Sequence, residues 1–108
     1  MRASPGLDLA EVQRQVDAWI AENGGYWDPM SLTLRLAEET GEVAREVNHR
    51  FGAKKKKSSE ADSALEDELG DVLFILVCLA NQQGIDLSTA FERVLEKLRI
   101  RDAGRWTS

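Results

Sequence analysis

The sequence has little of what membrane spans, disulfide frameworks and DNA-binding surfaces require. Its longest uninterrupted apolar run covers residues 72–80, far short of the ~20 residues of a membrane-spanning helix. A lone cysteine, Cys78, excludes an intrachain disulfide, and its apolar neighbours predict a buried thiol. With 14 Lys and Arg against 19 Asp and Glu, the formal net charge of -5 disfavours a protein whose main task is to grip duplex DNA.

Other absences limit the classes of architecture and the cellular location that the sequence allows. The N-terminal segment lacks the apolar stretch of a signal peptide. Only two prolines and eight glycines among 108 residues exclude linker-rich and collagen-like chains. A hydrophobic share of 43% is too high for a disordered chain, and the length suffices for one core but not for two. These features predict a single domain, residues 1–108, that is soluble and cytoplasmic.

Apolar residues recur at helical spacing in four stretches, whereas no stretch shows the apolar–polar alternation of a strand. Asp8 and Glu11 have the spacing of a capping box, and Asn23-Gly24-Gly25 ends the helix that follows. The remaining helices are expected at about 31–51, at about 64–83, and after a cap at Asp86 or Ser88.

The segments between and after these helices lack apolar periodicity. Residues 53–64, which include Lys54–Lys57, are predicted to form a mobile loop, and residues 102–108 a short tail. The fold class is therefore all-α, a four-helix bundle.

The third predicted helix is apolar on every side, so it must be covered on every side. The side that carries Asp71 is expected to lie under the second and fourth helices of the same chain. On a helical wheel, Leu73 and Val77 lie on the opposite side and need another cover. We therefore expect an oligomer-dependent core, with a homodimer as the simplest assembly.

Two pairs of acidic residues lie at the edges of apolar helical faces. Glu39 and Glu42 flank the apolar stripe of the second helix, while Glu68 and Asp71 lie within the apolar face of the third. Buried carboxylates of like charge are costly when unpaired. A hard divalent cation held between the two pairs would remove this cost, because Mg²⁺ prefers oxygen ligands.

A solvated acidic surface is the alternative interpretation of these carboxylates. Arg35 and Arg45 could form ion pairs with the acidic residues of the second helix. The third helix, however, contains no Lys or Arg between residues 63 and 85, unlike an ordinary surface helix. Two separate acidic pairs, each at the edge of a core face, favour the metal site.

Two acidic segments resemble the E-E-x-x-E … E-x-x-D pattern of the MazG-like nucleoside triphosphate pyrophosphohydrolases. The first is E-E-T-G-E, with Glu38, Glu39 and Glu42, and the second is E-L-G-D, with Glu68 and Asp71. The resemblance covers about residues 9–101. It implies an all-α fold that assembles as a dimer or a dimer-based tetramer. It also implies hydrolysis of (deoxy)nucleoside triphosphates to the monophosphate and pyrophosphate with Mg²⁺, with Mn²⁺ as a substitute.

The same resemblance implies roles for individual residues. Glu39, Glu42, Glu68 and Asp71 would be the metal ligands, and Glu38 would direct the attacking water and accept its proton. Lys97 and Arg101, one helical turn apart, match basic residues of the family's last helix that meet the phosphates. The family often has Asn two residues before that lysine, where this chain has Leu95.

Further candidates come from the residues themselves. Side chains with an aromatic face can stack on a nucleobase, and the candidate base contacts are Trp27, Trp19, Tyr26 and His49. Trp19 also falls on an apolar stripe, and we expect it mainly in the core. Lys54 and Lys55 in the predicted loop are further candidates for phosphate binding, although a solvated loop or a nucleic-acid tether would have the same composition.

Two other functions compete with hydrolysis. A di-iron bundle needs two Glu-x-x-His pairs, and the chain has only Glu46-x-x-His49. A non-catalytic nucleotide-binding or regulatory module of the same fold would keep the metal site without turnover. The retention of all four carboxylates favours the enzyme. The sequence does not specify the preferred base.

Overall fold

The structure is a computed structural model, which describes residues 7–52 and 65–101. These residues form four helices and no strand, which confirms the all-α class: α1 (Leu9–Glu22), α2 (Pro29–Phe51), α3 (Leu65–Gln82) and α4 (Leu87–Arg101). The predicted loop at 53–64, with Lys54 and Lys55, and the predicted tail at 102–108 lie outside the described residues.

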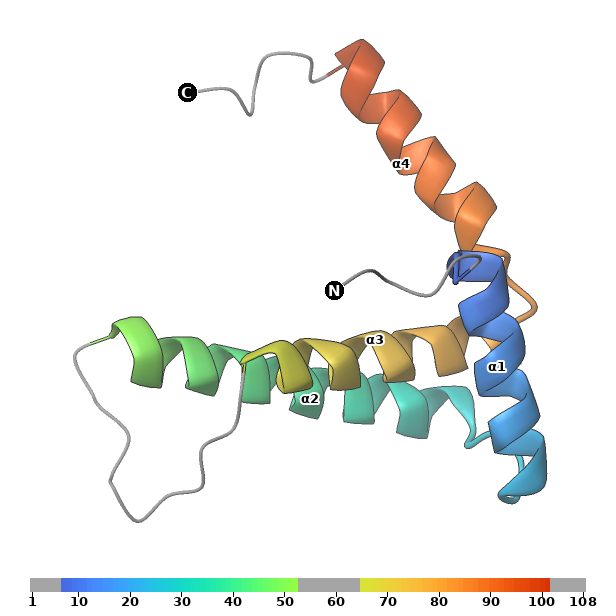
Figure 1. Cartoon of the computed structure of the whole chain (residues 1–108), viewed down its shortest axis with the longest axis horizontal. Helices are drawn as coiled ribbons and strands as arrows, with labels where there is room; N and C mark the ends of the chain where they lie inside the picture. Colours follow the sequence, from blue (N-terminus) through green and yellow to red (C-terminus); the bar gives the residue numbers. More distant parts are fainter. Residues whose placement is uncertain (1–6, 53–64, 102–108) are drawn as a thin grey trace.

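A long antiparallel pair, α2 and α3, forms the centre of the molecule (Figure 1). α1 crosses one end of this pair, and α4 leads away from the same end after a turn. α4 contacts α1 close to its own beginning. The prediction that the fourth helix covers the Asp71 side of α3 is therefore wrong within one chain, because α2 is the one described helix that lies along α3.

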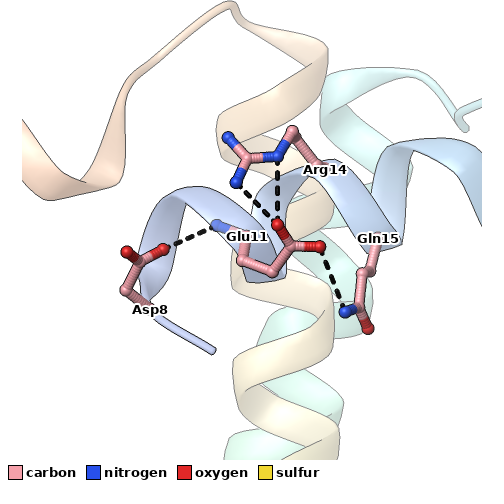
Figure 2. A network of polar contacts seen from close by, with 4 residues as sticks. All are labelled: Asp8, Glu11, Arg14 and Gln15. Carbon is pink, nitrogen blue, oxygen red and sulfur yellow. Dashed lines mark hydrogen bonds and ion pairs between the residues drawn. The ribbon is translucent and has the colours of Figure 1, made fainter. Parts of the chain in front are cut away.

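The predicted cap of α1 is present. The Asp8 carboxylate accepts a 2.9 Å hydrogen bond from the backbone N–H of Glu11, which satisfies one of the free donors at the helix start. The Glu11 carboxylate accepts side-chain hydrogen bonds from Arg14, at 2.6 Å, and from Gln15, at 3.2 Å (Figure 2). Glu11 therefore stabilises the first turns of α1 through its side-chain neighbours.

α2 begins two residues earlier than the sequence indicated. Asp28 caps it by accepting 2.9 Å hydrogen bonds from the backbone N–H and the hydroxyl of Ser31, and these bonds lower the pKa of Asp28. Pro29 takes the first helical position, where its missing N–H costs nothing. The segment Asp28-Pro29 is thus a helix start that lies just before the predicted range of about 31–51.

A sharp turn separates α3 from α4. Gly84 adopts a φ of 68°, a conformation that side chains rarely tolerate. Of the two predicted caps, Asp86 is the one used, since it accepts hydrogen bonds from the backbone of Ser88 and the hydroxyl of Thr89, both at 3.0 Å. The two helices are bent by 109° at this break.

The buried core lies along α3, where its inner face meets the neighbouring helices. Cys78 is 2% exposed, which confirms the buried thiol, and burial raises its pKa. Val77 is 0% exposed within the single chain. The prediction that Val77 needs a partner for cover is therefore wrong. The core is completed by Leu32, Ile75 and Ala80.

The outer side of α3 is apolar and uncovered in the single chain. Leu69, Leu73 and Leu76 are at least 40% exposed and recur at helical spacing, so they form one stripe. α4 likewise exposes apolar side chains, namely Phe91, Val94 and Ile100. Two helices thus present apolar surfaces that their own chain leaves open.

Side-chain amides tie α1 to the turn between α3 and α4. The Gln13 amide donates to the Asn81 side chain and to the Ile85 carbonyl, both at 2.8 Å. Its oxygen accepts a 2.9 Å bond from the Leu87 backbone N–H at the start of α4. One side chain therefore holds the beginning of α4 against α1 and α3.

Among the described residues, no single helix has the length and apolar composition that crossing a membrane demands. Only α3 and α4 taken together, across their sharp bend, meet that length and composition test.

Candidate metal centre and adjoining cavity

Three carboxylates from α2 and α3 converge near the middle of the helix pair. One oxygen from each of Glu39, Glu68 and Asp71 lies within 4.8 Å of the other two. The Glu39 side chain is 12% exposed, whereas Glu68 is half-buried and Asp71 faces solvent. Three hard oxygen donors at such spacing fit a divalent cation that keeps some of its waters.

The other two predicted acidic residues lie outside this cluster. Glu42, one turn further along α2, has a side chain that is 52% exposed and lies 3.8 Å from Arg45. Glu38 is 74% exposed and lies 4.0 Å from Arg35. The structure thus brings together three of the four predicted metal ligands and leaves Glu38 beside them at the surface.

Arg35 forms an ion pair with the most buried carboxylate of the cluster. Its Nε donates to Glu39 Oε2 at 2.7 Å, one turn along α2. This bond and the charge of Glu39 raise the pKa of Arg35, and the charges of Glu38 and Asp71 add to the effect. The guanidinium therefore lies in the field of three carboxylates.

A cavity of about 460 Å³ opens beside the acidic cluster, within the range of small-molecule sites. Glu39 and Asp71 form its acidic end together with Arg35, and apolar core residues such as Ile75 and Cys78 contribute to its walls. α1 and the α1–α2 connection contribute the remaining wall, which is largely aromatic: Trp19, Tyr26 and Trp27, with Phe74 from α3.

The aromatic wall is partly open to solvent. Trp19 and Phe74 meet edge to face, with ring centroids 6.0 Å apart and an interplanar angle of 81°. Trp19 is 54% exposed and Trp27 is 55% exposed. The expectation that Trp19 belongs mainly to the core is therefore wrong, because its apolar stripe continues onto the cavity wall.

Tyr26 is the polar member of this wall. Its hydroxyl donates to Asp17 at 2.7 Å and accepts from the Asn81 amide at 2.9 Å. Burial and the bond to Asp17 raise the pKa of Tyr26 to about 12, despite the opposing effect of Asn81. The ring is therefore held in one orientation as a neutral phenol.

The remaining predicted contacts lie elsewhere in the single chain. His49 is ten residues beyond Glu39 on α2, about 15 Å along the helix axis, and does not line the cavity. Its Nδ1 is buried without a hydrogen-bond partner. Lys97 and Arg101 lie on α4, where they line a separate shallow surface with Arg93, Glu96 and Ile100.

Three cavity features went unrecognised in the sequence. From the sequence, Arg35 is only a local ion-pair partner, although its spacing of four residues from Glu39 places both on one helix face. Asn81 anchors the Tyr26 hydroxyl, and no local pattern signals this contact between distant residues. Phe74 resembled any other apolar residue of a helix that is apolar all round.

Comparisons with known proteins match the chain to a family and to solved structures. Residues 28–106 match the family model of the MazG nucleotide pyrophosphohydrolase domain. The chain is 50% identical over 100 residues to the uncharacterised protein YpjD of Bacillus subtilis, across 92% of this chain and 90% of that protein. It is also 38% identical over 71 residues to the gene 37 protein of mycobacterium phage L5, across 65% of this chain and 62% of that protein.

Two solved structures share the fold. The crystal structure of YpjD from Bacillus subtilis, described as a pyrophosphatase, gives a TM-score of 0.77 at 47% identity, across 90% of this chain and 97% of that chain. The crystal structure of a MazG protein conserved in Bacillus, described as a nucleotide pyrophosphohydrolase, gives 0.76 at 41% identity, across 94% and 96%.

Proposed function

We propose a function from the premise that the chain belongs to the MazG nucleotide pyrophosphohydrolase family and is a hydrolase of that family. In this proposal, it cleaves (deoxy)nucleoside triphosphates to the monophosphate and pyrophosphate with Mg²⁺. The observation that carries this proposal is the convergence of Glu39, Glu68 and Asp71 from two helices beside an aromatic-walled cavity. A nucleotide offers a triphosphate for one end of this site and a base for the other.

Glu39, Glu68 and Asp71 would hold the divalent cation, with Glu42 a fourth ligand when its exposed side chain turns toward them. The bound ion would supply Lewis-acid polarisation of the phosphate and a lower pKa for a coordinated water. Three carboxylates would otherwise repel an anionic substrate, so they also make binding depend on the cation. Mn²⁺ has the same preference for oxygen ligands and would substitute.

Glu38 is the proposed general base. It lies next to Glu39 in sequence but outside the cluster, and its exposed carboxylate remains available to accept a proton. It would take the proton of the water that attacks the α-phosphorus, and pyrophosphate would leave on the opposite side.

The aromatic wall would bind the base. Trp27 and Trp19 present exposed ring surface to the cavity, and stacking on an aromatic face tolerates every nucleobase. Tyr26, fixed by Asp17 and Asn81, would limit how deeply the base enters. His49 lies too far along α2 to join this wall within one chain.

We also propose that the protein is a homodimer or a dimer-based tetramer. The exposed stripe of Leu69, Leu73 and Leu76 and the apolar side of α4 would be covered by a second copy. Lys97 and Arg101, which lie away from the cavity of their own chain, would then meet phosphates only where the assembly brings α4 to a site. Lys54 and Lys55 would act similarly from the connecting segment.

Release of pyrophosphate from a panel of nucleoside triphosphates tests the proposal directly. We expect stoichiometric monophosphate and pyrophosphate with Mg²⁺ or Mn²⁺, and none after removal of the cation with EDTA. Release of inorganic phosphate instead would refute cleavage at the α-phosphorus. Nucleotide binding without any turnover across the panel would identify a regulatory module of the same fold.

A further inference from the structure

Arg35 lies between the acidic cluster and the open cavity. Within the described part of the chain it is the only Lys or Arg that lines this cavity. Its side chain is 44% exposed, so the guanidinium is accessible from the cavity, while its Nε is bonded to Glu39. One residue thus contacts the cluster and faces the space where a substrate would lie.

The ion pair between Arg35 and Glu39 occupies one of the lone pairs through which Glu39 could bind a cation. Glu39 is the most buried of the three carboxylates, and its Oε2 accepts the Arg35 Nε–H at 2.7 Å. A guanidinium and a divalent cation that share one carboxylate repel each other and compete for its electron pairs. Arg35 therefore opposes metal binding when no other anion is present.

A triphosphate changes this balance. Arg35 carries five N–H donors in a planar fork that matches phosphate oxygens as well as carboxylates. Once Glu39 is shared with a cation, its oxygens are weaker acceptors for the guanidinium, and a phosphate in the cavity offers a stronger one. The side chain needs only rotamer changes to turn from Glu39 toward the cavity that it already lines.

We propose that Arg35 is a substrate-binding residue that exchanges partners: it pairs with Glu39 in the nucleotide-free protein and binds a substrate phosphate once the cluster holds its cation. The inference rests on the proposed function and adds to it a phosphate contact inside the chain's own cavity. It also predicts that Arg35 has opposite effects on the affinities for the cation and for the nucleotide. Arg35 lowers the affinity for the cation alone and raises the affinity for the nucleotide.

The test measures these two affinities separately in Arg35→Gln, which removes the charge and keeps a side chain of similar length. Mn²⁺ binding without nucleotide, followed by isothermal calorimetry, should tighten roughly three- to tenfold, because a neighbouring positive charge is lost. Binding of a non-hydrolysable α,β-imido nucleotide in the presence of saturating Mn²⁺ should weaken roughly 10- to 100-fold, the range for a hydrogen bond to a charged group.

Two further variants separate the proposal from a general loss of charge or of structure. Arg35→Lys should recover part of the nucleotide affinity but less than the wild type, because an ammonium cannot form the planar fork. Arg14→Gln breaks a comparable ion pair, 2.6 Å from Glu11 on α1, and should leave both affinities unchanged. Circular dichroism and thermal melting check that each variant is folded.

The outcomes distinguish this inference from the proposed function. Opposite shifts of the two affinities in Arg35→Gln support the exchange of partners. Weaker binding of both Mn²⁺ and nucleotide would assign Arg35 a structural role in the cluster, and unchanged nucleotide affinity would remove it from the substrate site. A wild-type protein that binds Mn²⁺ neither alone nor together with the nucleotide would overturn the metal site itself.

Discussion

The hydroxyl of Tyr26 accepts a 2.9 Å hydrogen bond from the side-chain amide of Asn81. Because the same amide donates to the Gln13 carbonyl at 2.9 Å, a cavity residue is connected to both α1 and α3. The bond from Gln13 to the start of α4 extends the connection to the last helix. The aromatic wall of the cavity is therefore set by side chains from opposite ends of the sequence.

Tyr26 should ionise only at strongly alkaline pH. Its pKa in the folded protein is raised to about 12 from the ordinary value of 10.0. Since Tyr26 is the sole tyrosine, the ultraviolet absorbance of phenolate reports this group alone. We expect the titration midpoint near pH 12 in the folded protein and near 10 in denaturant.

The sign of the associated stability change follows from proton linkage. Between the two pKa values the folded state holds a proton that the unfolded state has lost, so the free energy of unfolding falls as the pH rises. The stabilisation is complete below pH 10 and is lost toward pH 12. Tyr26→Phe should remove this pH-dependent component. A midpoint of 10 in the folded wild type would contradict the bonded arrangement.

Neutralising one carboxylate of the cluster should abolish hydrolysis without unfolding the protein. We expect Asp71→Asn and Glu39→Gln each to lower Mg²⁺-dependent turnover by about two orders of magnitude or more, because each removes an anionic ligand. Both changes nearly preserve side-chain volume. Glu66→Gln, an exposed position in the first turn of the same helix as Asp71, serves as the control. Wild-type turnover by Asp71→Asn at saturating Mg²⁺ would exclude the site.

Mg²⁺ alone should stabilise the fold. An ion that binds only the native state adds about 1.4 kcal/mol to the free energy of unfolding at ten times its Kd, or about 6 °C in Tm. The gain should shrink in Glu68→Gln, which weakens the cluster. Differential scanning fluorimetry with and without millimolar Mg²⁺ measures both. No shift in the wild type would mean that the cation binds only together with nucleotide.

Two substitutions on α3 distinguish the proposed interface from the core. Leu73 is 43% exposed in the single chain, so Leu73→Asp should leave the monomer folded but separate the dimer. Val77 is fully buried, and Val77→Asp should unfold the chain, because an unpaired buried charge costs several kcal/mol. Sedimentation velocity and circular dichroism measure the two effects. A wild type that sediments as a folded monomer would refute the interface.

The sequence contained enough to predict the helices and most of the acidic cluster. Glu68 and Asp71 are three residues apart in an apolar helix, so their shared face follows from the helical repeat alone. Glu39 lies at the edge of the apolar stripe of α2. When α2 packs this stripe against α3, Glu39 comes close to Glu68 and Asp71. Helix starts were predictable where a cap pattern existed, as at Asp8.

The arrangement beyond single helices was less predictable, for physical reasons. A helix that is apolar all round has no periodicity to say which side is inner, and Val77 was misplaced accordingly. The apolar stripe of α4 indicates that one face of the helix is covered, but it does not identify the covering surface. The position of Lys97 and Arg101 relative to the acidic cluster therefore does not follow from the sequence. Trp19 lies on the apolar stripe of α1 and lines the cavity, and helical periodicity does not distinguish a cavity wall from a core contact. Asn81 acts through contacts that only the tertiary fold creates.

The turn at Gly84 makes α4 a lever arm. With 15 residues the helix is about 22 Å long, and it touches the rest of its chain near its own beginning. A rotation of about 10° at the turn would therefore move its far end by about 4 Å, enough to make or break an ion pair at Arg101. Small changes in the hydrogen bond between the Gln13 side chain and the Leu87 backbone N–H would thus produce larger displacements at the opposite end of α4, where Lys97 and Arg101 lie.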